Sequence, residues 1–261
     1  MSQEPGASLA FLTSAAAQGY SGGSYVVIVR TREEFARWLR EPAPGVEWLQ
    51  VQGLLQDQAA WAIAAQGTSK LPLDVILTDP ATEFSGLYRL VDARIVRSVR
   101  VTMPAAPGFM KALRLAVSLQ LPVRLLPGQP STEALAELAE AAQFYLHDPM
   151  VETPVEFFHS LLAALGGAEG DTLWLMLEED PKAFIRDQPP PPRDFVEKRL
   201  AHLVEQSGEC ATCRWQKVCS GYFKWPDPTY DCAGVKQLLS TIQSAADEIG
   251  RDLASREATA S

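Results

Sequence analysis

The chain has 261 residues, 47% of them hydrophobic and 21% charged, and carries a formal net charge of −9 at pH 7. These proportions are ordinary for a globular protein with a full core. The acidic balance argues against a nucleic-acid partner, because phosphate binding depends on clustered Lys and Arg. No run of about 18 apolar residues occurs, so we expect neither a transmembrane helix nor a membrane partner.

Residues 1–23 are rich in Ala, Ser and Gly and are predicted to form a flexible N-terminal lead. Their short apolar stretch has no basic region before it, so we do not expect a cleaved signal peptide. The expected location is therefore the cytoplasm. In that reducing compartment clustered cysteines bind metals more often than they form disulfides.

Residues 24–150 alternate short β-rich runs with helical stretches, which predicts an α/β domain. Five strands are predicted, at 25–30, 46–53, 73–78, 94–102 and 122–126. Thr31 and Glu34 form a capping-box pattern at the start of a predicted helix over 31–40. Such alternation implies parallel βα units with right-handed crossovers. Five units are too few for a closed eight-stranded barrel, so we expect a partial (βα) barrel or an open parallel sheet.

The character of the sequence changes after residue 150. Residues 151–207 are predicted to form a connecting helical region that contains a four-proline linker at 189–192. Its stretch 172–179 is compatible with strand or helix, and 193–207 with a helix. Residues 208–255 are expected to form a small, loop-rich cysteine domain closed by a helix over 235–253.

All four cysteines of the chain fall in this last segment, as Cys210, Cys213, Cys219 and Cys232, with the spacing C-x2-C-x5-C-x12-C. Four soft ligands in one short segment predict a single metal site. Zinc accepts four thiolates in a tetrahedron, although the second half here is not a second C-x2-C pair. A [4Fe–4S] cluster also takes four thiolates. The residues alone leave these two ligands open, and a pair of disulfides ranks third.

The stretch CATCRWQKVCSGYF, followed by PTYDC ending at Cys232, resembles the SPASM domain of radical S-adenosylmethionine (SAM) enzymes. The motif of that family reads C-x2-C-x5-C-G-G-x-C, with a later cysteine that often follows a Tyr. The resemblance implies that the four cysteines ligate one auxiliary [4Fe–4S] cluster. Phe223 occupies the place of the cysteine that would serve a second cluster, so one cluster is implied rather than two.

The catalytic motif of the same family, C-x3-C-x2-C after the first strand, is absent. Thr31-Arg32-Glu33-Glu34-Phe35 stands in its place, and no cysteine precedes Cys210. We therefore expect no SAM-binding cluster and no SAM cleavage by this chain on its own. The resemblance then implies a non-catalytic partner or scaffold protein. Such a protein would assist a radical SAM enzyme in modifying a ribosomally made peptide, by docking the enzyme or precursor peptide or by relaying electrons.

Two alternatives stay open at the level of the sequence. One is an independent iron–sulfur enzyme with non-SAM chemistry, and the other is a zinc-stabilised protein-interaction module. The three histidines, His147, His159 and His202, have no ligand-spaced partner and are assigned no role. No catalytic residue is assigned either. Five aromatic residues crowd the cysteine segment and could shield a cluster from water or form a docking surface, with shielding favoured: Trp215, Tyr222, Phe223, Trp225 and Tyr230.

Overall fold

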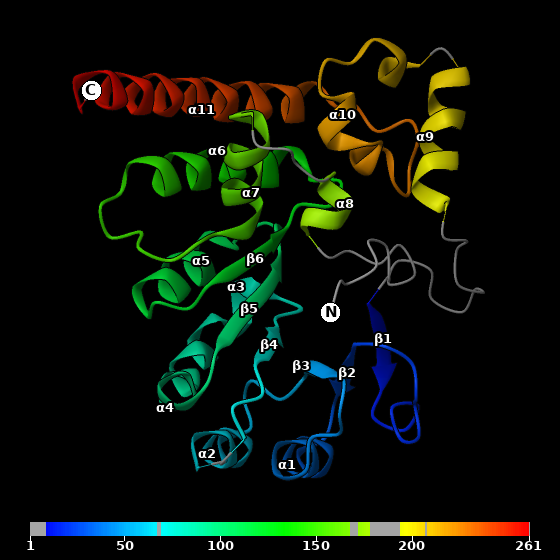
Figure 1. Ribbon diagram of the computed structural model, residues 1–261, viewed down its shortest axis with the longest axis vertical. Coiled ribbons are helices and arrows are strands. Elements are labelled where there is room, and N and C mark those ends of the chain that lie inside the picture. The colour runs from blue at the N-terminus through cyan, green and yellow to red at the C-terminus, as the bar shows by residue number, and fades with distance from the viewer. Residues whose placement is uncertain (1–8, 67–68, 168–171, 178–193, 207, 261) are drawn as a thin grey trace. The chain divides into compact units, whose positions relative to one another are not determined.

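The computed structural model describes residues 9–66, 69–167, 172–177, 194–206 and 208–260. It confirms the α/β class and the open, all-parallel sheet, which has six strands in the order β1-β2-β3-β4-β5-β6 (Figure 1). The strands are β1 Ala10–Thr13, β2 Tyr25–Val29, β3 Val46–Gln52, β4 Leu73–Ile76, β5 Val99–Pro104 and β6 Val123–Leu126. Consecutive strands of the chain are thus neighbours in the sheet. The general rule of right-handed crossovers then predicts that their connecting helices lie on one face of the sheet.

Two strand predictions need correction. The predicted strand over 94–102 is wrong in its first half, because Val91–Val96 forms helix α4 and β5 begins only at Val99. Ala93 is buried and Ile95 is exposed, so the apolar residues there follow the helical period instead of the strand period. The prediction of five strands is also wrong. A sixth, β1, lies within the expected lead and pairs Phe11 with Val26 of β2.

The chain divides into two compact units. Unit 1 comprises Met1–Pro104 and Gly108–Val123. Its helices are α1 Arg32–Arg40, α2 Gln58–Gln66, α3 Pro80–Glu83, the 3-10 helix η1 Phe84–Leu90, α4 Val91–Val96 and α5 Met110–Ser118. Alternate strand residues such as Leu49, Val51 and Val75 are buried. Phe35 of α1 and Trp61 of α2 are buried too, with their rings edge to face at 5.6 Å.

The predicted capping box at the start of α1 is confirmed. The Thr31 hydroxyl accepts a hydrogen bond from the Glu34 N–H at 3.2 Å, and the Glu34 carboxylate accepts one from the Thr31 N–H at 3.3 Å. We expect Thr31→Ala to lower the free energy of unfolding by about 1 kcal/mol, because one N–H at the helix start loses its partner. Urea denaturation measures this loss. Thr31→Ser is the control and should retain most of the stability.

Polar side chains occupy the other side of the strands in unit 1, where the sequence analysis singled out none. Asp74 is 1% exposed and in register with Gln50 and Arg100 of the flanking strands. Its carboxylate lies 3.2 Å from Nη2 of Arg100 and accepts a hydrogen bond from Thr102 Oγ1 at 2.6 Å. A charged residue inside the short apolar run LDVI was the available signal for this buried pair.

Unit 2 comprises Ala105–Pro107 and Arg124–Ser261. Its helices are α6 Thr132–His147, α7 Glu156–Leu165, α8 Leu173–Met176, α9 Phe195–Glu205, η3 Glu209–Thr212, α10 Gln216–Cys219, η4 Tyr222–Lys224 and α11 Ala233–Ala260. The long α11 packs against α6 and α7 (Figure 1). Its apolar stripe includes Val235, Leu239 and Ile242, which are all buried.

The sequence of the stretch 172–179 is compatible with a strand or a helix. In the structure Leu173–Met176, within this stretch, is helical. Residues 178–179 and the proline run at 189–192 lie outside the described residues. The closing helix predicted over 235–253 is confirmed as α11, which begins two residues earlier and extends to Ala260. None of the helices in the described ranges is both long and apolar enough to cross a membrane.

Candidate metal centre

The structure brings the four cysteines together around one pocket in unit 2. Cys210 lies in η3, Cys213 directly follows it, Cys219 ends α10, and Cys232 directly precedes α11. No pair of them forms a disulfide. Two short helical turns and the residue before a long helix therefore supply the four side chains.

Side-chain contacts and backbone angles hold these turns in position next to one another. The side chain of Gln216 donates to the carbonyl of Cys210 at 3.1 Å, which ties η3 to α10. After Cys219 the chain reverses through two left-handed residues, Ser220 at φ 45° and Gly221 at φ 75°. A Cβ on Gly221 would lie 2.9 Å from Cδ1 of Leu203, so glycine suits both the angle and the space.

This reversal places the main chains of Phe223 and Gly221 next to Cys219, where they act to lower the pKa of its thiol against the larger, opposite effect of burial. Main-chain groups that stabilise a thiolate in this way favour metal ligation in general, in a zinc site as well as in an iron–sulfur cluster.

The pocket between the cysteines is small and walled by apolar side chains. Trp215, Phe223, Val235 and Leu239 line it. The centre of a water molecule can occupy about 20 Å³ of it. That space is far below the range of small-ligand sites, about 300–1,000 Å³.

The thiols form the walls of this space. Within the described ranges, no three His, Cys, Asp or Glu side chains converge closely enough to share one metal ion. A single zinc ion would need four sulfurs about 2.3 Å from its centre. The iron atoms of a [4Fe–4S] cluster are each bound by a different cysteine, so the cluster holds its thiolates farther apart.

Burial favours the protonated form of three of these thiols. It raises the pKa of Cys219 to about 11 and that of Cys232 to about 12, the latter with a further contribution from the charge of Glu209. Burial also raises the pKa of Cys210. A metal bound here must therefore displace protons, as is usual for thiolate sites.

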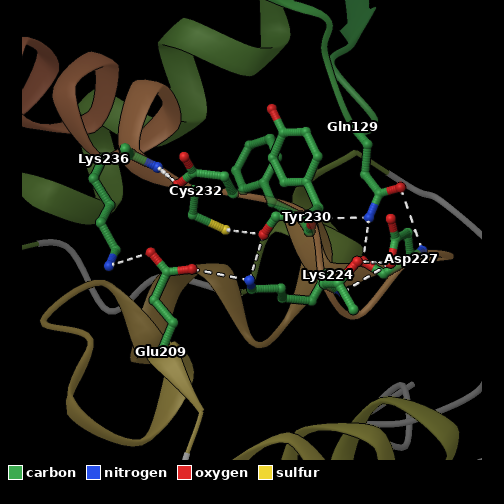
Figure 2. A network of polar contacts seen from close by, with 11 residues as sticks. Gln129, Glu209, Lys224, Asp227, Tyr230, Cys232 and Lys236 are labelled. Atoms are coloured by element: carbon green, nitrogen blue, oxygen red, sulfur yellow. Dashed lines mark hydrogen bonds and ion pairs between the residues drawn. The ribbon is translucent and has the colours of Figure 1, made fainter.

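A pair of lysines joined by one carboxylate lies beside the cysteines (Figure 2). We call Glu209, Lys224 and Lys236 the lysine bridge. Glu209 Oε2 is 2.9 Å from Lys224 Nζ, and Glu209 Oε1 is 2.6 Å from Lys236 Nζ. Lys224, which is only 7% exposed, also donates to the carbonyl of Tyr230. All three side chains of the bridge also line the cysteine pocket.

The lysine bridge leaves one positive charge in excess next to the thiols. Burial alone would raise the pKa of Glu209, but the hydrogen bonds from Lys236 and Lys224 outweigh it and hold the pKa at about 2. One carboxylate is thus shared by two ammonium groups. Such an excess favours an anionic group in the pocket, and a metal bound by four thiolates carries negative charge.

Three of the five aromatic residues of this segment are buried: Trp215, Tyr222 and Phe223. Tyr222 and Phe223 pack edge to face at 5.1 Å. Tyr230 is half-buried, and its hydroxyl donates to the carbonyl of Pro130 at 2.8 Å. Gln129 Nε2 donates to the carbonyls of Phe223 and Asp227, which fastens the loop (Figure 2). These contacts favour the shielding role over a docking role.

The histidines lie apart from the pocket lining. His159 Nδ1 is 3.2 Å from the Tyr145 hydroxyl, and His202 Nε2 is 3.0 Å from Gln206 Nε2. The lysine bridge was not among the residues predicted from the sequence. Its members directly adjoin or closely follow cysteines, but Lys and Glu are so common at protein surfaces that this position alone was no signal.

Comparison of the chain with family models, with curated proteins and with solved structures found no match.

Proposed function

We propose that the cysteine pocket holds one [4Fe–4S] cluster, ligated by Cys210, Cys213, Cys219 and Cys232. The observation that carries this proposal is that all four cysteines of the chain line one small, apolar pocket. The resemblance of their spacing to the SPASM motif supports iron–sulfur over zinc.

The residues present fit such a cluster in two further respects. Apolar side chains line the pocket, and the lysine bridge supplies positive charge. When bound, the cluster would supply one-electron transfer or structural cross-linking. The chain itself would ligate it, exclude water from it and balance its charge.

We further propose that the protein is a non-catalytic partner or scaffold of a radical SAM enzyme in the modification of a ribosomally made peptide. The absence of cysteine before Cys210 supports this, because the SAM-cleaving motif needs three. Four thiol ligands also leave a cluster closed, which is typical of structural and electron-transfer sites. In this proposal the chain docks the enzyme or the precursor peptide, or relays electrons.

The metal content tests the cluster proposal. Protein purified without oxygen is expected to be brown, to absorb broadly near about 400 nm and to contain about four irons per chain. Cys219→Ser should lower the iron content. Colourless protein with one zinc per chain would contradict the cluster and support a zinc-stabilised interaction module instead.

Co-purification tests the partner proposal separately. A tagged form of this chain, expressed in its own host, is expected to retain a radical SAM enzyme and to show no turnover alone. Turnover by the isolated chain without SAM would overturn the scaffold and favour an independent iron–sulfur enzyme.

A further inference from the structure

A second and wider pocket opens beside the cysteine pocket, between the η3–α10 turn and the first turns of α11. We call it the Arg214 pocket, and its volume is about 360 Å³. That volume lies within the range of small-ligand sites, about 300–1,000 Å³. The side chains that matter for its chemistry are Thr212, Cys213, Arg214, Trp215, Lys236 and Ser240.

Arg214 is held in place by two neutral contacts. Its guanidinium lies 4.3 Å from the centroid of the Trp215 ring, and its Nη2 donates to Ser240 Oγ at 2.6 Å. Within the described part of the chain these are its contacts, and neither is a carboxylate. A guanidinium stacked on a ring and fixed at one nitrogen still presents planar N–H donors. That geometry matches a carboxylate, which accepts two parallel hydrogen bonds.

The remaining lining strengthens the preference for a negative group. Lys236 lines this pocket and shares its carboxylate partner, Glu209, with Lys224, so that one carboxylate does not neutralise both ammonium groups. Thr212 adds a hydroxyl that can donate to an oxygen. Cationic groups thus gather here in a chain whose net charge is −9.

Cys213 lines both pockets. An occupant of the Arg214 pocket would therefore lie next to one of the proposed cluster ligands, at a half-exposed cysteine. Partners that exchange electrons with a buried centre, or that sense it, need such a point of close approach. The Arg214 pocket is thus a charged recess that adjoins the cysteine site.

We propose that the Arg214 pocket binds an acidic segment of a protein partner, with a carboxylate side chain paired to Arg214. Charge complementarity selects this occupant, because two cationic side chains, Arg214 and Lys236, line a recess of ligand size. The proposal goes beyond the cluster and does not depend on which metal the cysteines hold. It requires only that the segment from Glu209 to Ser240 is folded.

A fluorescent oligoglutamate peptide tests the docking site, with anisotropy as the measurement and an oligolysine peptide as the opposite-charge control. We expect the whole protein to bind oligoglutamate and not oligolysine. Raising the salt from about 0.05 M to about 0.5 M should weaken the binding, because it screens exposed charges. Arg214→Gln should weaken it by about tenfold or more, since a paired, charge-assisted hydrogen bond is lost.

Lys217→Gln is the matched control, because it removes the same charge from an exposed residue that does not line the pocket. Equal weakening by Lys217→Gln and Arg214→Gln would overturn the proposal in favour of a general charge effect. So would the absence of peptide binding, or competition by free glutamate at equal residue concentration. Metal content and the absorption spectrum, measured on the same samples, are expected to be unchanged in Arg214→Gln. A failed cluster is thereby distinguished from failed docking.

Discussion

Replacing Phe223 by alanine is expected to lower the free energy of unfolding of unit 2 by about 3–5 kcal/mol. The side chain is 1% exposed, packs against Tyr222 and lines the cysteine pocket. Its removal leaves a cavity directly beside the thiols and opens a path for water. We therefore expect faster loss of the bound metal in air as well as lower stability. Chemical denaturation and the decay of metal content measure the two effects.

Phe35→Ala is the matched control for this prediction. Phe35 is also fully buried, but it lies in unit 1, away from the cysteines in the sequence and in a different compact unit. Its removal should cost a similar free energy and leave the rate of metal loss unchanged. If both variants lost metal equally fast, the shielding role of Phe223 would be wrong. Phe223→Leu should fall between Phe223→Ala and the unmodified protein, because it refills part of the cavity.

Periodicity in the sequence was enough to predict the class of the fold and most strands. The runs at 25–30, 46–53, 73–78 and 122–126 are short and apolar and lie between helical stretches, so their role in a parallel sheet could be inferred. The strand β1 has four residues, AFLT, without a β-branched run and in an Ala-rich context. Its pairing with β2 is a tertiary contact, which local pattern does not reveal.

The site shows the same division between local and long-range information. Cysteine is rare and chemically specific, so the grouping of four thiols could be read from spacing alone. The lysine bridge joins residues 209, 224 and 236, whose separations follow no helix or strand period. Gly221 is a similar case. Its φ is left-handed, and a Cβ at this position would lie too close to Leu203 of α9. Only the folded backbone shows such constraints.

The lysine bridge and the apolar lining together explain why this segment can keep four thiols, one of them buried, next to charged groups. Lys224 is nearly fully buried, which is costly for a cation without partners. Glu209 and the carbonyl of Tyr230 supply those partners, and both belong to the loops that carry Cys210 and Cys232. The bridge therefore links the first and last cysteines of the site through one ion-pair network.

Glu209→Gln is expected to lower the free energy of unfolding by about 2–3 kcal/mol, because it leaves the buried Lys224 without its carboxylate. Denaturation of the whole protein measures the loss. Asp57→Asn is the control, since it breaks a pair of similar length, 2.8 Å, with the half-exposed Arg32 and should cost much less. In the double variant Glu209→Gln with Lys224→Met, part of the stability should return, because the unpaired buried charge is gone. A double variant less stable than Glu209→Gln alone would contradict the account of Lys224 as a buried cation that depends on Glu209.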